Sequence, residues 1–293
     1  MTDPYAEHRR LLFATAYRML GSVADAEDVM QDAWLRWAAT DQASVEYPKA
    51  YLVRTVTNLS INRLQSARAQ RESYVGPWLP EPLLTSPDVA DDAEIADSVS
   101  MALLIVLETL SPLERAVFLL REVFGYSHAE IATALDRSES AVRQAAHRAQ
   151  EHVSARRPRF DADRSRQREV VERFRAACAG GDLNEMMAVL APNVTLWADG
   201  GGKVSAATRP LHGASNVARW VVGVLAKPQA QGVKAQLALI NGEPGLLATF
   251  GGVPVGAVTF SIAEGRVAEL RWVVNPDKLA GLGRRAADHP NMG

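Results

Sequence analysis

The sequence predicts two all-helical domains followed by an α+β domain. Apolar residues recur at three- and four-residue spacing through the first half of the chain, which is typical of amphipathic helices. The last third instead carries short apolar stretches bounded by turn residues, which favour strands. A proline-rich segment interrupts the helical half, and a length of 293 residues suits two or three domains of ordinary size.

The composition excludes several classes of protein. Apolar residues make up 47% of the chain, so a disordered state is not expected. The single cysteine, Cys178, allows neither an internal disulfide nor a Cys-rich zinc site. The chain starts without a signal segment and has no apolar run of about 18 residues, so we expect a cytoplasmic protein with no membrane contact, no metal and no cofactor.

The charge is balanced overall but unevenly distributed. With 32 basic and 34 acidic residues the net charge is −2, which by itself argues mildly against nucleic-acid binding. However, residues 22–32 and 76–100 contain acids and no base, whereas six arginines stand against two glutamates between Arg137 and Arg159. The segments can therefore have different partners.

Residues 1–74 are expected to form the first helical domain. Gly21 ends its first helix, and Pro48 suits the first turn of its third. The predicted helices span residues 7–20, 24–39 and 48–71.

Residues 75–96 contain four prolines and many acids, and they predict an extended linker. The apolar group around Trp78 is unusual for a solvated spacer. We therefore expect this tryptophan to pack onto a neighbouring domain.

Residues 97–160 are expected to form a second helical domain. Capping boxes are predicted at Ser111 and Ser127, and Ser138 can cap a further helix. The last two helices, joined by a tight turn, form a helix-turn-helix. They span residues 129–135 and 139–152.

Residues 165–285 are expected to form the α+β domain. A helix is predicted over 170–179, and a capping box at Asp182 begins another that ends at Leu190. The turn Ala263–Gly265 supports a hairpin. Strands are predicted over residues 194–197, 233–240, 246–250, 255–262 and 267–274.

Two stretches of the first domain, Ala16–Ser22 and Asp25–Leu35, resemble the polymerase-binding region of extracytoplasmic-function (ECF) sigma factors, bacterial proteins that direct RNA polymerase to promoters. The resemblance implies that this helix docks on the coiled coil of the polymerase β′ subunit, with the β subunit as a further partner. On charge alone, a solvated helix start explains the same acids. The residues assigned to polymerase binding are Asp25, Glu27, Asp28, Gln31, Asp32 and Trp34.

The next helix, beginning with Tyr51–Asn58, resembles the ECF segment that reads the −10-type promoter element and captures a flipped base. The residue types fit, since amides can read base edges and arginines can hold phosphates. Asn62 departs from the family pattern, which usually has aspartate there, and an arginine-rich surface helix is the alternative interpretation. The assigned residues are Asn58, Asn62, Arg63, Arg68 and Arg71.

The helix-turn-helix and the helix before it, within Leu110–Arg143, resemble the ECF region that reads the −35-type element. Arginine and glutamine near the start of a recognition helix can reach base edges in the major groove. Many helical hairpins share this form, so the helix-turn-helix alone is only moderately specific. The resemblance is stronger because the two matching regions follow one another in the order found in the family. The assigned residues are Ser140, Arg143, Gln144, His147 and Arg148.

The last third resembles the SnoaL-like (NTF2-like) cone that is fused to one subgroup of ECF sigma factors. The resemblance rests on three short motifs, and it implies that the cone regulates the factor in cis through them. We expect the charged ends of the triple-glycine loop, Asp199 and Lys203, to contact another domain. The assigned regulatory residues are Trp78, Leu79, Pro80, Glu81, Pro82, Asp199, Gly200, Gly201, Gly202, Lys203, Asn275, Pro276, Asp277 and Lys278.

The sequence thus indicates a transcription initiation factor that binds core RNA polymerase and promoter DNA and is regulated by its own C-terminal domain. Two alternatives stay open: a regulator whose cone pocket senses a small molecule, and an enzyme fused to a DNA-binding domain. All six tyrosines precede residue 127, which excludes a tyrosine-based oxyanion site in the C-terminal domain. Only Asp199 or Asp277 with His212 remains as a catalytic set, so we predict no catalytic residues.

Overall fold

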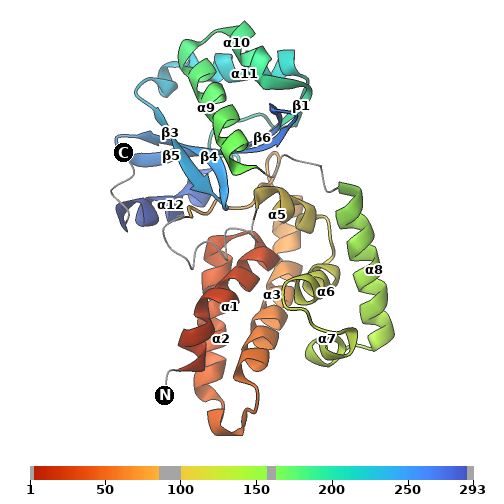
Figure 1. Ribbon diagram of the computed structural model, residues 1–293. Helices are drawn as coiled ribbons and strands as arrows, with labels where there is room; N and C mark the ends of the chain where they lie inside the picture. Colours follow the sequence, from red (N-terminus) through yellow and green to blue (C-terminus); the bar gives the residue numbers. More distant parts are fainter. Residues whose placement is uncertain (1–2, 86–99, 157–162, 289–293) are drawn as a thin grey trace. The chain divides into compact units, whose positions relative to one another are not determined.

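The computed structural model describes residues 3–85, 100–156 and 163–288 (Figure 1). The chain divides into two compact units, Met1–Ser73 with Ala102–Arg157, and Tyr74–Met101 with Pro158–Gly293. The described part of the first unit is all helical and that of the second is α+β, so the predicted fold class is confirmed. Among the described helices, none is both long and apolar enough to cross a membrane.

Three helices form the N-terminal part of the first unit: α1 (Pro4–Leu20), α2 (Val23–Ala39) and α3 (Pro48–Glu72). Gly21 ends α1 in the left-handed conformation with φ of 65°, and the hydroxyl of Ser22 caps α2. Trp37 and Tyr17 are buried between these helices. A short 3-10 helix, Gln42–Ser44, lies between α2 and α3.

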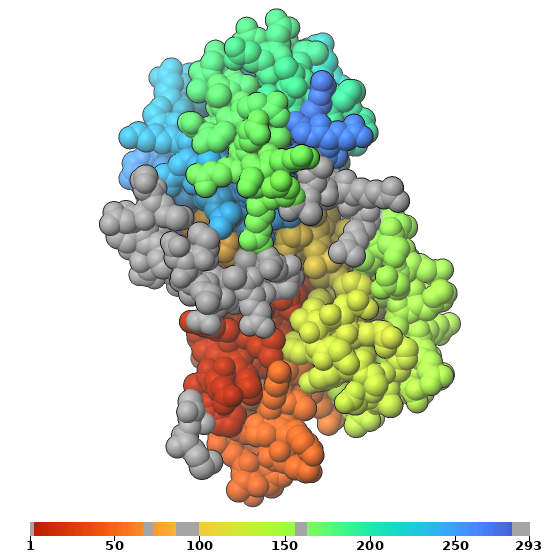
Figure 2. All heavy atoms as spheres, viewed as in Figure 1, coloured from red at the N-terminus to blue at the C-terminus, as the bar shows by residue number. Residues whose placement is uncertain are grey.

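The C-terminal part of the first unit contains the predicted helix-turn-helix. Both predicted capping boxes, at Ser111 and Ser127, are formed, and the hydroxyl of Ser138 accepts a hydrogen bond from the start of the last helix. Asp136 adopts φ of 52° and makes the tight turn. Figure 2 shows atoms of the last two helices, in yellow to yellow-green, on the surface of the molecule in this view. The helices are α5 (Met101–Glu108), α6 (Pro112–Glu122), α7 (His128–Leu135) and α8 (Glu139–Arg156).

The second unit is built on a six-stranded sheet in the order β2-β1-β6-β5-β4-β3. Strands β1 and β6 are parallel and the other neighbours are antiparallel. The strands are β1 (Leu190–Asp199), β2 (Leu211–His212), β3 (Lys234–Ile240), β4 (Glu243–Phe250), β5 (Val253–Ala263) and β6 (Arg266–Val273). The helices are α9 (Arg164–Gly180), α10 (Leu183–Val189), α11 (Ala214–Leu225) and α12 (Pro276–Asp288), and a 3-10 helix spans Pro228–Ala230.

Helices α9, α10 and α11 cover one face of this sheet and enclose the hydrophobic core of the second unit, whose part after residue 163 we call the cone (Figure 1). Phe174 of α9 packs edge-on against Phe260 of β5, with ring centroids 5.1 Å apart. Trp220 of α11 packs in the same way against Trp272 of β6 at 5.5 Å. Aromatic pairs of this geometry add to the stabilisation that burial alone provides.

All five predicted strands are present, but β2, α11 and α12 were not expected. Helix α11 begins at Gly213, which offers no side chain to cap it, so the usual start signal is missing. Helix α12 contains Gly281 and Gly283, which weaken a helical pattern. The predicted β5–β6 hairpin is confirmed, and its two turn residues, Glu264 and Gly265, both have positive φ.

Polar side chains are buried on the other face of the sheet. Thr259, Ser261 and Arg271 alternate along their strands with the core residues, so they point away from α9–α11. Arg271 is 3% exposed and pairs with Glu269. Its Nε and Nη1 atoms, and the hydroxyls of Thr259 and Ser261, have no hydrogen-bond partner in the described part of the chain.

Glu243 belongs to the same polar group, and burial raises its pKa to about 7, although Arg271 and Arg164 oppose the shift. The folded unit therefore keeps the carboxyl proton up to about pH 7, whereas an unfolded glutamate loses it at its ordinary pKa of 4.5. Since the unfolded state then binds fewer protons, the free energy of unfolding falls as the pH rises between these two values.

We predict that Glu243→Gln removes this pH dependence. At about 1.4 kcal/mol per pKa unit, the wild-type unit should lose about 2–3 kcal/mol of unfolding free energy, relative to the variant, between about pH 5 and pH 8. Urea titrations at the two pH values measure the loss, and the exposed Glu264→Gln serves as control. Equal pH dependence in wild type and Glu243→Gln would contradict the assignment.

Candidate functional site

The acidic residues predicted to bind polymerase lie on the solvent side of α2. The opposite stripe of this helix, Ala26 to Trp37, is buried against its neighbours. Trp34 and Leu35 are 47% and 52% exposed. Large apolar side chains left in solvent beside acids are a feature of protein interfaces. Asp25 is half-buried, whereas Glu27, Asp28, Gln31 and Asp32 are exposed.

Arg63, predicted to contact DNA, pairs in the free chain with two of these acids. Its Nε atom donates to Asp25 at 2.8 Å and its Nη2 atom donates to Asp28 at 2.7 Å. The three side chains are exposed or half-buried, and ion pairs of this kind contribute at most about 1 kcal/mol. The pairing joins residues assigned to two different partners, and it is weak enough to be exchanged for a phosphate.

The two asparagines of α3 line a cavity of about 590 Å³ with side chains from the other half of the unit. Asn58 is half-buried, and its Nδ2 atom donates to the carbonyl oxygen of Ala134 at 3.3 Å. Asn62 is exposed and lies one turn further along α3. Arg68 and Arg71 lie on α3, but their side chains are outside the described part of the structure.

The predicted −35-reading residues of α8 are all solvent-exposed. Arg143 pairs with Glu139 one turn earlier, at 2.5 Å, and Ser140 lies within 3.1 Å of the Ser138 hydroxyl. Gln144 has an exposed side chain on the same helix. His147 is 3.5 Å from the carboxylate of Glu151.

Arg148 has a structural partner as well. Its Nε atom donates to Glu114 at 2.6 Å, and Glu114 also closes the capping box of α6. Burial would raise the pKa of Glu114, but the hydrogen bonds from Arg148 and Ser111 outweigh it and hold the pKa below its usual value. Arg148 therefore fastens α8 to the start of α6 in the free chain.

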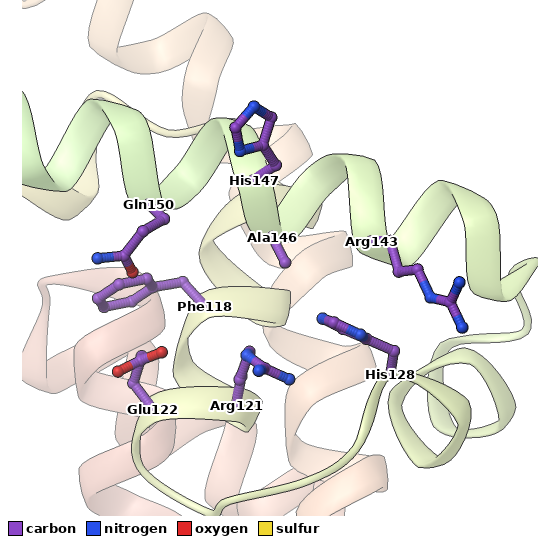
Figure 3. A pocket seen from close by; sticks show the side chains of 8 residues that line it. All are labelled: Phe118, Arg121, Glu122, His128, Arg143, Ala146, His147 and Gln150. Atoms are coloured by element: carbon purple, nitrogen blue, oxygen red, sulfur yellow. The ribbon is translucent and has the colours of Figure 1, made fainter.

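Figure 3 shows a pocket of about 440 Å³ between α6, α7 and α8. Arg143, His147 and Gln150 come from α8, and Arg121 and His128 face them from α6 and α7. Arg121 and His128 were not predicted as site residues from the sequence. Arg121 lies in the last turn of α6, and His128 is the first residue of α7. Phe118, Glu122 and Ala146 complete the lining.

In the second unit, the three regulatory motifs meet at Asp199, the last residue of β1. Its side chain is fully buried. One oxygen accepts hydrogen bonds from the Tyr74 hydroxyl at 2.5 Å and the Gly201 amide at 3.1 Å. The other accepts from the Leu79 amide at 2.9 Å and the Lys278 ammonium at 2.7 Å.

Lys278 lies in a cage built by residues 74–79. Its Nζ atom donates to the carbonyl oxygen of Leu79 at 2.5 Å. It lies 4.1 Å from the centroid of the Trp78 ring and 4.9 Å from that of Tyr74. Cation–π contacts of this kind are strongest when the cation is desolvated, and this side chain is 11% exposed.

The other residues of the three motifs position the side chains around Asp199. Asn275 donates to the Tyr74 hydroxyl at 2.8 Å, and Lys203 pairs with Asp277 at 2.6 Å. A Cβ atom on Gly200 would collide with the backbone of Val204, and one on Gly201 would collide with Asn275. The loop therefore requires glycine at both positions. Gly202 has positive φ, and Pro276 begins α12.

The described end of the proline-rich segment, residues 74–85, folds with the second unit, and we call it the docked segment. Pro80, Glu81 and Pro82 are buried within it. Its end pairs with the edge of the sheet, because the Thr85 amide donates to Leu239 at 3.0 Å and the Asn241 amide donates to Leu83 at 2.7 Å. It covers an edge that would otherwise be unpaired there.

Two sequence-based expectations are corrected here. Asp199 and Lys203 contact the docked segment and α12, which belong to their own unit and not to another domain. The exclusion of a tyrosine from the C-terminal domain was also wrong, because Tyr74 precedes that domain in the sequence but folds into it. Burial, followed by the bond to Asp199, raises the Tyr74 pKa.

Of the remaining candidate catalytic residues, Asp199 and His212 are not brought together. His212 is exposed and contacts Thr195, with 3.2 Å between Nδ1 and Oγ1. Thr195 is four residues before Asp199 on the same strand, a distance of about 13 Å. Asp277 is paired with Lys203.

Comparison with known proteins matches both helical parts of the first unit. Residues 4–70 match Sigma-70 region 2, and residues 100–153 match Sigma-70 region 4. With the α+β unit that follows them, these regions define a sigma-type transcription initiation factor with an appended C-terminal domain.

Two relatives come from Mycobacterium tuberculosis. The chain is 38% identical over 290 residues to the ECF RNA polymerase sigma factor SigJ, covering 93% of this chain and 91% of SigJ. It is 30% identical over 281 residues to the probable ECF sigma factor SigI, covering 94% and 93%. The crystal structure of SigJ matches with a TM-score of 0.76 and 34% identity, over 94% of this chain and 97% of that one.

The chain belongs to the family of ECF RNA polymerase sigma factors. It is a transcription factor that binds core RNA polymerase and promoter DNA.

We predict that Lys278→Met loosens the docked segment. It leaves the Asp199 carboxylate buried without its counter-ion, which costs about 3–5 kcal/mol. Hydrogen exchange at the Leu79 amide should accelerate, and thermal unfolding of the second unit should begin earlier. The double variant Asp199→Asn/Lys278→Met should recover part of the loss.

Lys203→Met is the matched control, because its ion pair is exposed and contributes at most about 1 kcal/mol. If Lys203→Met were to cost as much as Lys278→Met, the buried pair would not be the anchor of the segment.

Proposed function

We propose that the C-terminal cone regulates this sigma factor in cis through the docked segment. The observation that carries the proposal is the set of contacts at Asp199 and Lys278, which hold residues 74–85 on the cone. Those residues lie, in sequence, between α3 of region 2 and α5 of region 4. The connection between the two promoter-reading regions therefore passes through the regulatory domain.

The proposed polymerase contact is the exposed face of α2, which would dock on the β′ coiled coil, with the β subunit supplying further contacts. The four exposed polar side chains of this face and the exposed Trp34 support it. Acidic side chains around an apolar centre suit steering toward a basic partner surface. The factor would work in the cytoplasm, where promoter DNA and polymerase meet.

We predict that Glu27→Lys/Asp32→Lys slows association with core polymerase by about tenfold or more at low salt, because steering mainly raises association rates. The difference in association rate between variant and wild type should narrow as the salt concentration rises, because screening weakens the electrostatic steering that the variant lacks. Stopped-flow binding to core enzyme measures the rates. The exposed Glu46→Lys, outside this face, is the control, and an equal slowing by that variant would contradict the assignment.

The proposed promoter contacts are α3 for the −10-type element and α8 for the −35-type element. The exposure of Arg143 and Gln144 supports direct base reading by α8. The pocket in Figure 3 adds Arg121 and His128 as cationic or polar groups on the same side, which suits backbone phosphates.

We also propose that the cone has no catalytic role. Asp199 already accepts four hydrogen bonds within its unit, and Asp277 is held by Lys203. A carboxylate so engaged is unavailable as a general base unless these contacts break.

In vitro transcription with core polymerase tests the regulatory role. The chain truncated after residue 165 should still bind core polymerase but should differ from the full chain in promoter output at equal occupancy. The full-length Lys234→Met variant, exposed and outside the three motifs, controls for effects of substitution within the cone. Identical output from the truncated and full chains would overturn cis-regulation while leaving the sigma-factor assignment intact.

A further inference from the structure

Three buried polar side chains lie together on the face of the sheet that points away from α9–α11. Thr259 of β5 is directly opposite Arg271 of β6, and Ser261 lies two residues further along β5. Side chains of directly paired residues are about 5 Å apart, and those two residues apart on one strand are about 7 Å apart. The exposed fractions of Thr259, Ser261 and Arg271 are 2%, 3% and 3%, so bulk water does not reach this polar cluster.

The polar cluster is rich in hydrogen-bonding atoms that lack a partner. Arg271 donates from one nitrogen to Glu269, whereas its Nε and Nη1 atoms have no partner among the described residues. The hydroxyls of Thr259 and Ser261 are also unpartnered there. Because a buried polar group without a partner destabilises a fold, several of them side by side call for an explanation. A bound molecule that carries acceptor oxygens would satisfy all of them at once.

The charges around the polar cluster favour a ligand with one negative charge. Glu269 balances Arg271, and Glu243 at the start of β4 keeps its proton up to about pH 7, because burial raises its pKa to about 7. Arg164 lies near enough to oppose this shift, so it adds a positive charge to the surroundings. Burial lowers the pKa of Arg271, and a further anion beside the guanidinium would stabilise its charged form.

We propose that the polar cluster is a binding site for a small hydroxy- or keto-monocarboxylate. The carboxylate would accept hydrogen bonds from Nε and Nη1 of Arg271, which are of the strong, charge-assisted kind. The hydroxyl or carbonyl group of the ligand would lie against the hydroxyls of Thr259 and Ser261, which can both donate and accept. The site lies on the other face of the sheet from the aromatic core of the cone.

The proposed site lies on the face of the sheet that also holds the docked segment. The guanidinium carbon of Arg271 is 5.9 Å from the centroid of the Trp197 ring. Trp197 precedes Asp199 by two residues on β1, and side chains two residues apart on a strand point to the same face. The ligand would therefore bind on the side of the sheet where Asp199 anchors the docked segment. The binding itself does not depend on regulation in cis.

Calorimetry of the full chain tests whether the two hydroxyls lack partners in the absence of ligand. Thr259→Val and Ser261→Ala should each raise the unfolding midpoint of the second unit by about 2–4 °C in chloride buffer, because each removes an unsatisfied buried oxygen. If ordered water or another group satisfied these hydroxyls, both substitutions would lower the midpoint instead. That result would overturn the site.

Lactate and pyruvate, the simplest members of the ligand class, are the probes for binding. At about ten times its dissociation constant, a probe should raise the wild-type midpoint by about 3 °C over sodium chloride of equal ionic strength. Lactamide, the neutral amide of lactate, should leave the midpoint unchanged. Thr259→Val should weaken binding of lactate about fivefold or more, because it removes a hydrogen bond to the ligand.

Thr249→Val, near the other end of β4 from Glu243, is the matched control and should respond to both probes as wild type does. A wild-type midpoint that neither probe raises overturns the ligand class. An equal rise with lactamide overturns the role of the charge, and an equal affinity for lactate in wild type and Thr259→Val overturns the location of the site. None of these outcomes alters the transcription test of regulation in cis, so the two proposals fail separately.

Discussion

The ion pair between Asp199 and Lys278 is the contact on which the second unit's organisation depends. A carboxylate with no exposed surface is tolerated only when a counter-ion and further donors surround it. Lys278 supplies the charge, while the Tyr74 hydroxyl and the Leu79 amide supply donors from the docked segment. Burial of one charge therefore fixes a distant stretch of chain as part of the cone.

The need to surround the buried Asp199 carboxylate explains why the three short motifs lie together in the structure. The glycines let the loop after Asp199 pass close to Val204 and Asn275, and Asn275 in turn orients the Tyr74 hydroxyl. The Trp78 ring lies against the ammonium, 4.1 Å from its centroid to Nζ. A change in one of these groups would alter how the chain between region 2 and region 4 is held, which gives a physical basis to the proposed regulation in cis.

Local signals in the sequence were sufficient for most of the elements. Capping boxes marked the starts of α6 and α7 because a serine and a glutamate three residues apart satisfy each other's backbone groups. The contacts around Asp199 could not be derived in that way, since Tyr74 and Asp199 are 125 residues apart. The order of residues along the chain is also misleading here. Tyr74 precedes region 4 in the sequence, yet it packs within the C-terminal unit. The pairing of Arg63 with Asp25 was equally invisible, because it joins two helices whose packing no local pattern reports.

In vitro transcription with the full-length Lys278→Met variant tests the central claim most directly. At saturating factor and equal core binding, the account predicts that Lys278→Met shifts promoter output away from wild type while Lys203→Met does not, because only the first breaks the buried pair. Wild-type output from Lys278→Met, in a protein whose Leu79 amide exchanges rapidly, would contradict it.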